Sequence, residues 1–366
     1  MMKKIVLACL LLVATLSFSC NEKQPATQTF LKDKSLHAGF EKAKAENKGL
    51  LLISNKTGCS MCELFEVDLM KDETYANQIY SDFVIQRVNE NATGNKWLSR
   101  ILNRGSFPIF LFFNKERKLI GLQMGAIKKD RMGKLLNKVR NSESWVDGHF
   151  QMGTEKDMSQ EKILDYVGNV IEAQYQWDSY NLSKQKTALA KMEAPLKESI
   201  NAYSTFYNNY LLSKYYALNN NSDQATKNAE TALLVEDPAA LYFNSGLRTE
   251  LKMIADKNYN AYTDAYIGLP EVDKNLGKLK FAAKTMVEFP VKNIGKKDLF
   301  LNNIVADCNC TVANYPKTAI RPGDTGIIRV NFTASRSGEF AHMLEIGSNA
   351  SNAPLQLTIK GLVLGD

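Results

Sequence analysis

The sequence predicts a multidomain chain in which an α/β part, an α-helical part and a β part follow one another. Residues 30–145 alternate helical and strand-like patterns. Residues 155–266 keep helical spacing, and residues 270–366 hold short apolar runs separated by turn residues. A chain of 366 residues is also too long for one ordinary core, so two or three domains are expected.

The first twenty residues have the pattern of a secretion signal. A basic start precedes an apolar run over residues 5–16 that is too short to span a membrane. With small residues before Cys20, this stretch resembles a bacterial lipoprotein signal, which implies that the Cys20 thiol is acylated and becomes the mature N-terminus. Residues 21–29 predict a flexible tether. We expect a lipid-anchored protein in the envelope of a Gram-negative bacterium, facing the periplasm or the cell surface. The alternative is an ordinary cleavable signal with an incidental cysteine.

The distribution of charge and of cysteines limits the classes of function that the sequence predicts. The formal net charge of +7 is spread along the chain without a dense basic block, so we expect no nucleic-acid partner. Four cysteines after the leader form two close pairs, Cys59/Cys62 and Cys308/Cys310. Disulfides persist in exported proteins, but pairs this close enclose almost no loop. The pairs therefore indicate redox or metal chemistry rather than disulfides that stabilise the fold.

The pattern over residues 30–145 is a helix, then βαβ, then ββα. The apolar run 50–53 predicts a strand covered on both faces, and a helix is expected from Ser60 onward. That helix should turn three side chains inward: Leu64, Phe65 and Leu69. Later segments complete the pattern: strands at 83–88, 108–113 and 119–122, a short helix at 97–102, and a last helix that includes residues 127–139.

A Cys-x-x-Cys pair between a buried strand and a helix has a physical meaning. Free N–H groups at the helix start favour an anion, so the pKa of the first thiol falls below its usual value of about 8.5. Cys59 is then the nucleophile that attacks a disulfide, and Cys62 is the resolving thiol that releases the product. We expect no cofactor beyond this redox-active disulfide, and no metal at the pair.

The residues around the pair resemble the thioredoxin family. The matching pieces are 50–53, Thr57-Gly58-Cys59-Ser60-Met61-Cys62, Arg104-Gly105-Ser106-Phe107-Pro108 and Met124-Gly125-Ala126. The resemblance implies a cis Phe107–Pro108 bond beside the active disulfide and a substrate-positioning role for both residues. It also shows departures. Gly58 replaces a tryptophan, and the family's buried acid falls on Ile53. The direction of electron flow is therefore left open, and a sensor or slow electron carrier stays an alternative.

Residues 155–266 predict helices with frequent tyrosines. The run Asn219-Asn220-Asn221 separates two of them, and residues 225–238 resemble the second helix of a tetratricopeptide-type repeat. One such segment leaves two interpretations open, a stack of repeat-like hairpins or a helical spacer.

The last part predicts a β-sandwich. Short strands are expected at 286–291, 299–305, 326–332, 341–346 and 355–364. Ala306-Asp307-Cys308-Asn309-Cys310-Thr311, with the Pro-Gly turn at 322–323, resembles an Ig-like bacterial domain family of unknown function that commonly carries Cys-Gly-Cys-Thr. Cys308 and Cys310 have three possible roles: a labile disulfide that exchanges with Cys59/Cys62, a soft-metal site for Cu(I), or two ordinary buried thiols.

The three histidines are His37, His149 and His342. None has ligand spacing to a cysteine, so all three are expected to be surface or packing residues.

The leading hypothesis is an envelope thiol–disulfide oxidoreductase that exchanges disulfides with exported proteins through Cys59 and Cys62 and has a redox partner of its own. The membrane is contacted through the N-terminal lipid. Two alternatives remain, a non-catalytic binding or scaffold lipoprotein and a copper-handling protein. The lack of a histidine near the first pair disfavours copper.

Overall fold

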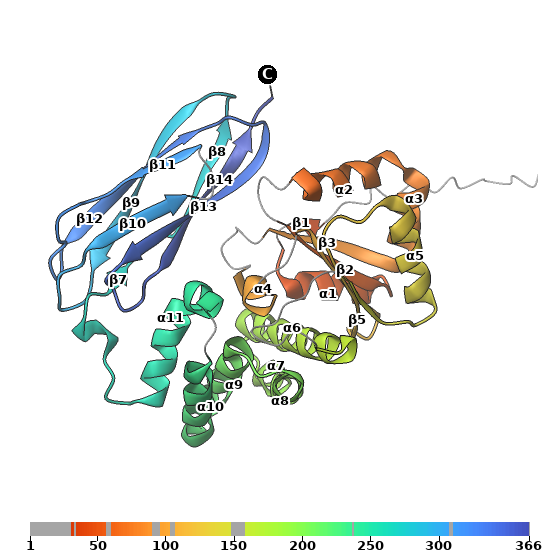
Figure 1. Ribbon diagram of the computed structural model, residues 1–366, viewed down its shortest axis with the longest axis horizontal. Helices are drawn as coiled ribbons and strands as arrows, with labels where there is room; N and C mark the ends of the chain where they lie inside the picture. The colour runs from red at the N-terminus through yellow and green to blue at the C-terminus, as the bar shows by residue number, and fades with distance from the viewer. Residues whose placement is uncertain are drawn as a thin grey trace, which may run out of the picture.

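The computed structural model describes residues 31–32, 34–55, 60–89, 96–102, 107–147, 158–235, 238–306 and 310–365. They form an α/β part, a helical part and a part built from two sheets (Figure 1). The predicted order of a thioredoxin-like α/β region, a helical middle and a sheet-rich C-terminal region is confirmed. The signal and tether lie outside the described residues.

The first sheet has six strands in the order β1-β3-β2-β4-β5-β6. Their bounds are β1 Leu31–Lys32, β2 Gly49–Asn55, β3 Phe83–Asn89, β4 Ile109–Phe113, β5 Leu119–Met124 and β6 Trp145–Asp147. β2 runs parallel to β3 and antiparallel to β4, and all seven of its residues are buried. The apolar run 50–53 therefore forms the expected central strand, because both of its faces are covered.

Helices cover both faces of this sheet (Figure 1). They are α1 Leu36–Ala45, α2 Ser60–Lys71, α3 Glu73–Asp82, α4 Lys96–Ile101 and α5 Lys129–Arg140. Buried residues of α2, α3 and α5 form one apolar core with Leu51, Ile53 and Phe110. Those of α1 and α4 belong to the core on the opposite face.

The structure corrects one prediction for α2. Phe65 is buried as predicted, but the Leu64 side chain is 51% exposed. The two residues are neighbours on a helix and lie about 100° apart around its axis, so only one of them faces the sheet. The Leu69 side chain lies outside what the structure describes.

Six helices form the middle of the chain. Their bounds are α6 Gln160–Ser183, α7 Lys186–Ala190, α8 Glu193–Ala202, α9 Phe206–Leu218, α10 Ser222–Leu234 and α11 Pro238–Ala255. α6 packs against α8, and α9 packs against α10 after the turn at 219–221. α9 begins with a capping box in which Thr205 and Asn208 satisfy each other's backbone N–H groups.

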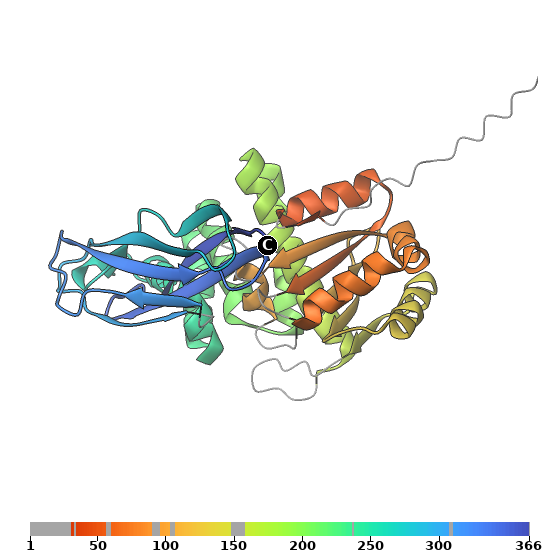
Figure 2. The ribbon, with the colours of Figure 1, turned by 90° about the horizontal axis from the view of Figure 1, so that it is seen from above.

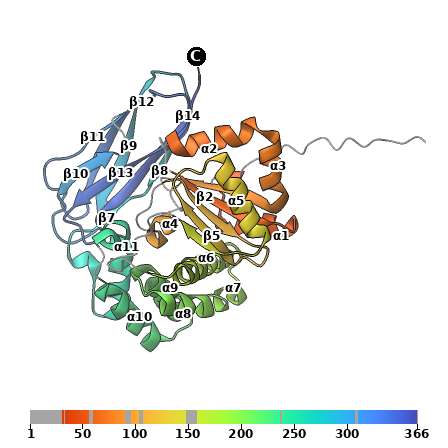
Figure 3. The same ribbon diagram turned by 45° about the vertical axis from the view of Figure 1, so that its right-hand side comes forward.

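The helical part shares a core with the α/β part. Val167, Val170 and Ile171 of α6 lie in the same apolar cluster as Leu119 and Leu122 of β5. Figure 3 shows α6 directly beneath the sheet, with the other middle helices beyond it. α6 therefore serves as a covering helix of the α/β sheet, and the middle helices are held to it by a continuous interior.

The C-terminal part consists of two four-stranded sheets, ordered β10-β13-β14-β8 and β11-β12-β9-β7. The bounds are β7 Ile267–Gly268, β8 Asp273–Leu279, β9 Lys284–Asn293, β10 Leu301–Ala306, β11 Thr311–Asn314, β12 Thr325–Thr333, β13 Gly338–Ser348 and β14 Leu355–Val363. Residues of both sheets form one apolar core, including Phe289, Ile328, Leu344 and Ile359. Every predicted strand of this region overlaps an observed one; β7, β8 and β11 were not expected.

Contacts between described residues connect the two-sheet part to the helical and α/β parts. The Thr249 hydroxyl of α11 donates to the carbonyl oxygen of Ser351 at 2.8 Å. Arg87 of β3 pairs with Glu339 of β13 at 3.7 Å. Figure 2 shows the two-sheet part beside the α/β part, consistent with these contacts.

Candidate functional site

Cys62 lies in the first turn of α2, at the carboxyl end of the central strand β2. Its side chain is buried, 5% exposed, and its sulfur is in a disulfide. Met61 beside it is 46% exposed, so the start of α2 reaches the protein surface. Cys59 lies outside the described residues, and its role as nucleophile stays a prediction.

The sequence produces this placement through two local effects. β2 is apolar throughout and is held between β3 and β4, which fixes where the strand ends at Asn55. Ser60 then starts α2, whose free N–H groups point back toward the end of the sheet. A sulfur near this end of a helix is stabilised as a thiolate, which is the reactive form in exchange chemistry.

Phe107 and Pro108 lie at the same end of the sheet. The peptide bond between them is cis, the isomer that the resemblance implied. β4 begins at the next residue, Ile109, which pairs with Ser54 near the carboxyl end of β2. The Pro108 carbonyl accepts a hydrogen bond from Gly125 N–H at 2.9 Å. The structure therefore brings Cys62, Pro108 and Gly125 to the same end of the sheet. The positioning roles of Phe107 and Pro108 stay predictions.

A cavity of about 460 Å³ lies at this end of the sheet. Met124 lines it, and Met124 pairs with Ile109 in the β4–β5 ladder. Its lining also includes Lys128, Arg131 and Lys134, with Asp130 and Asp147 as counter-charges. Arg131 forms an ion pair with Asp147. The cavity is thus lined by three cationic and two acidic side chains.

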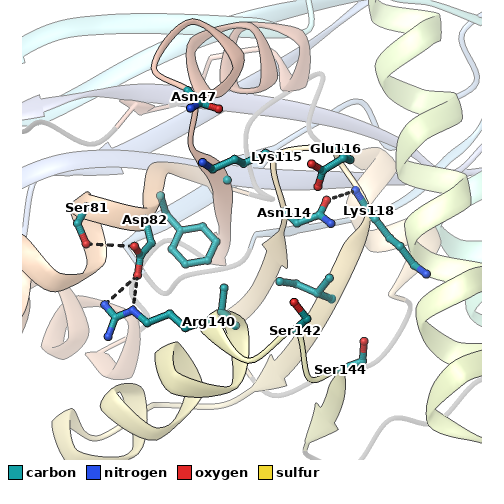
Figure 4. Close-up of a pocket in the computed structure, with 14 residues that line it drawn as sticks. Asn47, Ser81, Asp82, Asn114, Lys115, Glu116, Lys118, Arg140, Ser142 and Ser144 are labelled. Carbon is teal, nitrogen blue, oxygen red and sulfur yellow. Dashed lines mark hydrogen bonds and ion pairs between the residues drawn. The ribbon is translucent and has the colours of Figure 1, made fainter.

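A second cavity, of about 490 Å³, lies at the opposite end of the sheet (Figure 4). It is lined by Gly49 and Phe83, which begin β2 and β3, and by Asn114 after β4. On one side Arg140 donates to Asp82 at 3.0 Å. Because Cys62 follows the other end of β2, this cavity is remote from the cysteine and takes no part in its chemistry.

Ile53 occupies the position where the family has a buried acid. It is 4% exposed and shares an apolar core with Phe65 and Phe110, whose rings meet edge to face at 4.8 Å. The side chains of Glu63 and Asp68 are not described. This face of the sheet is thus apolar at Ile53, and any proton transfer at the cysteines has to use another group.

The second cysteine pair has an environment that the sequence did not reveal. Cys310 is half-buried and in a disulfide, and its sulfur lies 3.5 Å from Nε2 of His342. The rings of Phe332 and Phe340 lie 5.6 and 5.7 Å from the imidazole. His342 therefore packs against aromatic rings, as expected. The approach of the two sheets also brings it to Cys310, which its spacing in the sequence did not indicate. Cys308 lies outside the described residues.

The other histidines do not approach the described cysteines. Nδ1 of His37 is 2.7 Å from the Ser179 hydroxyl, and its ring stacks on Tyr175 at 5.4 Å. His37 therefore has a packing role between α1 and α6, as expected. His149 lies outside the described residues.

Comparisons with known families agree with this architecture. Residues 36–140 match the family of the thioredoxin-like domain. Residues 268–363 match a family described as protein of unknown function (DUF1573). The search of curated proteins found no match.

Solved structures resemble separate parts of the chain. A thioredoxin from Thermus thermophilus is 16% identical, with a TM-score of 0.28, over 31% of this chain and 88% of its own. A candidate disulphide-isomerase from Bacteroides thetaiotaomicron is 22% identical, with a TM-score of 0.27, over 31% of this chain and 91% of its own. A protein of unknown function from Porphyromonas gingivalis W83 is 19% identical, with a TM-score of 0.25, over 29% of this chain. This chain spans half of the length of that last protein.

The proposed lipid attachment site, Cys20, lies outside the described residues. Within the part of the chain that the structure describes, none of the helices combines the length and apolar character of a membrane span.

Proposed function

We propose that this chain is an envelope thiol–disulfide oxidoreductase that exchanges disulfides with exported proteins through Cys59 and Cys62. One observation carries the proposal. Cys62 is a buried, disulfide-bonded sulfur in the first turn of the helix that follows the central strand of a thioredoxin-like sheet. A cysteine three residues upstream is the natural partner of that sulfur, since both then lie at the helix start.

The exchange balances in two steps. In the reduced protein the Cys59 thiolate attacks a client disulfide, forming a mixed disulfide and releasing one client sulfur as a thiolate. The Cys62 thiolate then attacks the sulfur of Cys59, and the second client sulfur leaves. The client disulfide is reduced to two thiols, while the protein dithiol is oxidised to a disulfide. A second, dithiol-bearing redox partner restores the reduced protein, and the reverse sequence oxidises a client dithiol.

The end of the sheet beside Pro108 is the proposed surface for binding the client protein. Pro108 is buried just before β4 begins, and Phe107 next to it is half-buried. The cavity of about 460 Å³ continues this surface and carries Lys128, Arg131 and Lys134. This charge favours client segments that bear acidic side chains.

The remaining assignments belong to the same proposal. Residues 1–20 are the lipoprotein signal, residues 21–29 the tether, and Cys20 the lipidated residue that attaches the protein to the membrane. The oxidoreductase region, 30–145, is then presented to the periplasm or the surface. The helices at 155–266 and an Ig-like sandwich at 270–366 position this region or hold a client. The disulfide is the redox group, with no further cofactor and no nucleic-acid partner.

The test is reduction of insulin by dithiothreitol, followed by turbidity. The parent protein should accelerate precipitation, and Cys59→Ser should fall to the rate without protein. His37→Asn, at the packed contact between α1 and α6, is the control, and it should match the parent. Equal rates for the parent and Cys59→Ser would remove Cys59 as the nucleophile.

The apolar surroundings of Ile53 favour a second candidate, a non-catalytic binding lipoprotein. The position where the thioredoxin family has its buried acid is occupied by Ile53, whose side chain cannot carry a proton in the exchange. A Cys59 thiol pKa near 8.5, measured from the pH dependence of alkylation, would support this candidate. A clearly lower pKa would support the enzyme.

A further inference from the structure

Cys310 and His342 come from different sheets and meet at the edge of the C-terminal part. Cys310 immediately precedes β11, while His342 lies on β13 in the other sheet. The distance from the sulfur to Nε2 is 3.5 Å, within the range of a hydrogen bond to sulfur. The contact joins residues that are 32 positions apart.

Both residues are held in place by their surroundings. The Cys310 carbonyl accepts a hydrogen bond from Thr333 N–H at 2.9 Å, which ties its backbone to the end of β12. The His342 ring stacks on Phe340, and Phe340 stacks on Phe332 at 4.5 Å. His342 is paired with Ile359 in the β13–β14 ladder. The imidazole is therefore pre-positioned against the sulfur and is not a mobile surface group.

An imidazole at this distance changes the chemistry of a disulfide. When a disulfide is cleaved, one sulfur departs as a thiolate, and its departure is faster when the charge is stabilised or protonated. Histidine is the side chain best suited to exchange a proton near neutral pH. Neighbouring positive charge is also a general cause of a lowered thiol pKa. A buried structural disulfide requires no such neighbour.

We propose that Cys310 is the leaving-group sulfur of a second thiol–disulfide exchange centre, with His342 as its acid–base residue. The co-reactant is a protein dithiol. One of its thiolates attacks the sulfur bonded to Cys310, that disulfide bond breaks, and Cys310 leaves as a thiolate that takes a proton from the His342 imidazolium. The second thiol of the co-reactant then resolves the mixed disulfide. The dithiol becomes a disulfide, and Cys310 and its partner become thiols. This centre stands independently of the function proposed for Cys59 and Cys62.

The location of the centre suits such an exchange. Glu339 lies three residues before His342 on β13, about 10 Å along the strand. It pairs with Arg87 of β3, which lies opposite Ile53 of β2. The C-terminal centre is thus carried by the strand that contacts the carboxyl end of the α/β sheet, the end where Cys62 lies.

The test uses the full chain with Cys59→Ser and Cys62→Ser, so that the first pair cannot contribute. The disulfide of Cys310 is reduced with dithiothreitol, and free Cys310 is alkylated with iodoacetamide at timed intervals and quantified by peptide mass spectrometry. With His342→Asn we expect reduction on the order of a hundredfold slower, the lower end of the effect of a lost acid–base group. His37→Asn, which removes the half-buried histidine of the helical interface, is the control and should leave the rate unchanged.

A second measurement distinguishes an acid–base role of His342 from a purely structural one. In the reduced protein the pH profile of Cys310 alkylation reports the pKa of its thiol, and His342→Asn should move that profile to higher pH. His342→Gln should do the same, so one variant suffices if the other does not fold. Rates within twofold of the background protein, or an unchanged pH profile, would overturn the proposal.

Discussion

The guanidinium of Arg117 donates from two nitrogens to the two carboxylate oxygens of Glu172, each at 3.0 Å. Arg117 lies in the turn between β4 and β5, and Glu172 lies on α6. The same guanidinium lies over the Tyr175 ring at 4.7 Å, and the Tyr175 hydroxyl donates to Glu41 of α1 at 2.7 Å. The bond to Glu172 raises the pKa of Arg117, while burial and the bond to Glu41 raise the pKa of Tyr175 to about 12. These contacts attach α6 to α1 and to the turn between β4 and β5, in the α/β part that contains Cys62.

We predict that Arg117→Met lowers the free energy of unfolding by about 1–2 kcal/mol, because a two-point charged hydrogen bond is lost from a half-buried site. Urea unfolding followed by circular dichroism measures the change. Arg329→Met is the matched control, since Arg329 makes a 2.8 Å pair with Glu288 on an exposed face. Exposed pairs contribute less, about 0–1 kcal/mol. Equal losses for the two variants would contradict the structural role assigned to Arg117.

Substitution of Gly168 tests whether α6 packs directly against β5. A Cβ built at Gly168 would lie 3.0 Å from Cβ of Leu119, whereas one built at Gly133 of α5 meets no atom within 4 Å. Gly168→Leu should therefore destabilise the protein by about 1–3 kcal/mol through overpacking. Gly133→Leu should leave stability unchanged or raise it by up to about 1 kcal/mol, because leucine favours helix more than glycine. Thermal unfolding of the two variants distinguishes them, and a tolerated Gly168→Leu would show that α6 does not press on the sheet.

Asp178 makes stability depend on pH. Burial raises the pKa of its carboxyl from 3.8 to about 6, although Gln174 donates a hydrogen bond to it at 2.9 Å and lowers the pKa in part. Because the pKa is higher in the folded state, the native protein binds more protons between about pH 4 and pH 6, and this contribution to stability is lost as pH rises through that window.

Asp178→Asn should therefore be more stable than the parent at pH 7, by about 2 kcal/mol after allowance for partial exposure. The two proteins should approach equal stability near pH 4. Urea unfolding at intervals between these values measures the difference. A difference that stays constant with pH would mean that Asp178 is not protonated in this range.

Much of the site was predictable because its signals are local. The buried run in β2, the two cysteines three residues apart and Pro108 each carry meaning within a few positions. Features that depend on strand register were not predictable. His342 reaches Cys310 only because of how two sheets stack, and nothing in the spacing of 32 residues indicates that.

The role of α6 was missed for a different physical reason. Helical spacing alone predicts one buried face, yet Leu164, Tyr166 and Ala173 are buried as well as Val167 and Val170. A helix that is apolar around most of its circumference is expected in the interior of a protein. The wide distribution of apolar residues around α6 was therefore the sequence feature that could have predicted its burial. The short edge strands β1, β6 and β7 have two or three residues and offer too little pattern to detect.

The central claim is that the Cys59–Cys62 pair is a functional redox couple. Its most direct test is the reduction potential of that couple, measured by equilibration of the Cys308→Ser/Cys310→Ser protein with glutathione or dithiothreitol buffers. We predict a value between about −270 and −120 mV, the range of proteins that exchange disulfides. A potential below about −300 mV, typical of disulfides that serve only structure, would contradict the account.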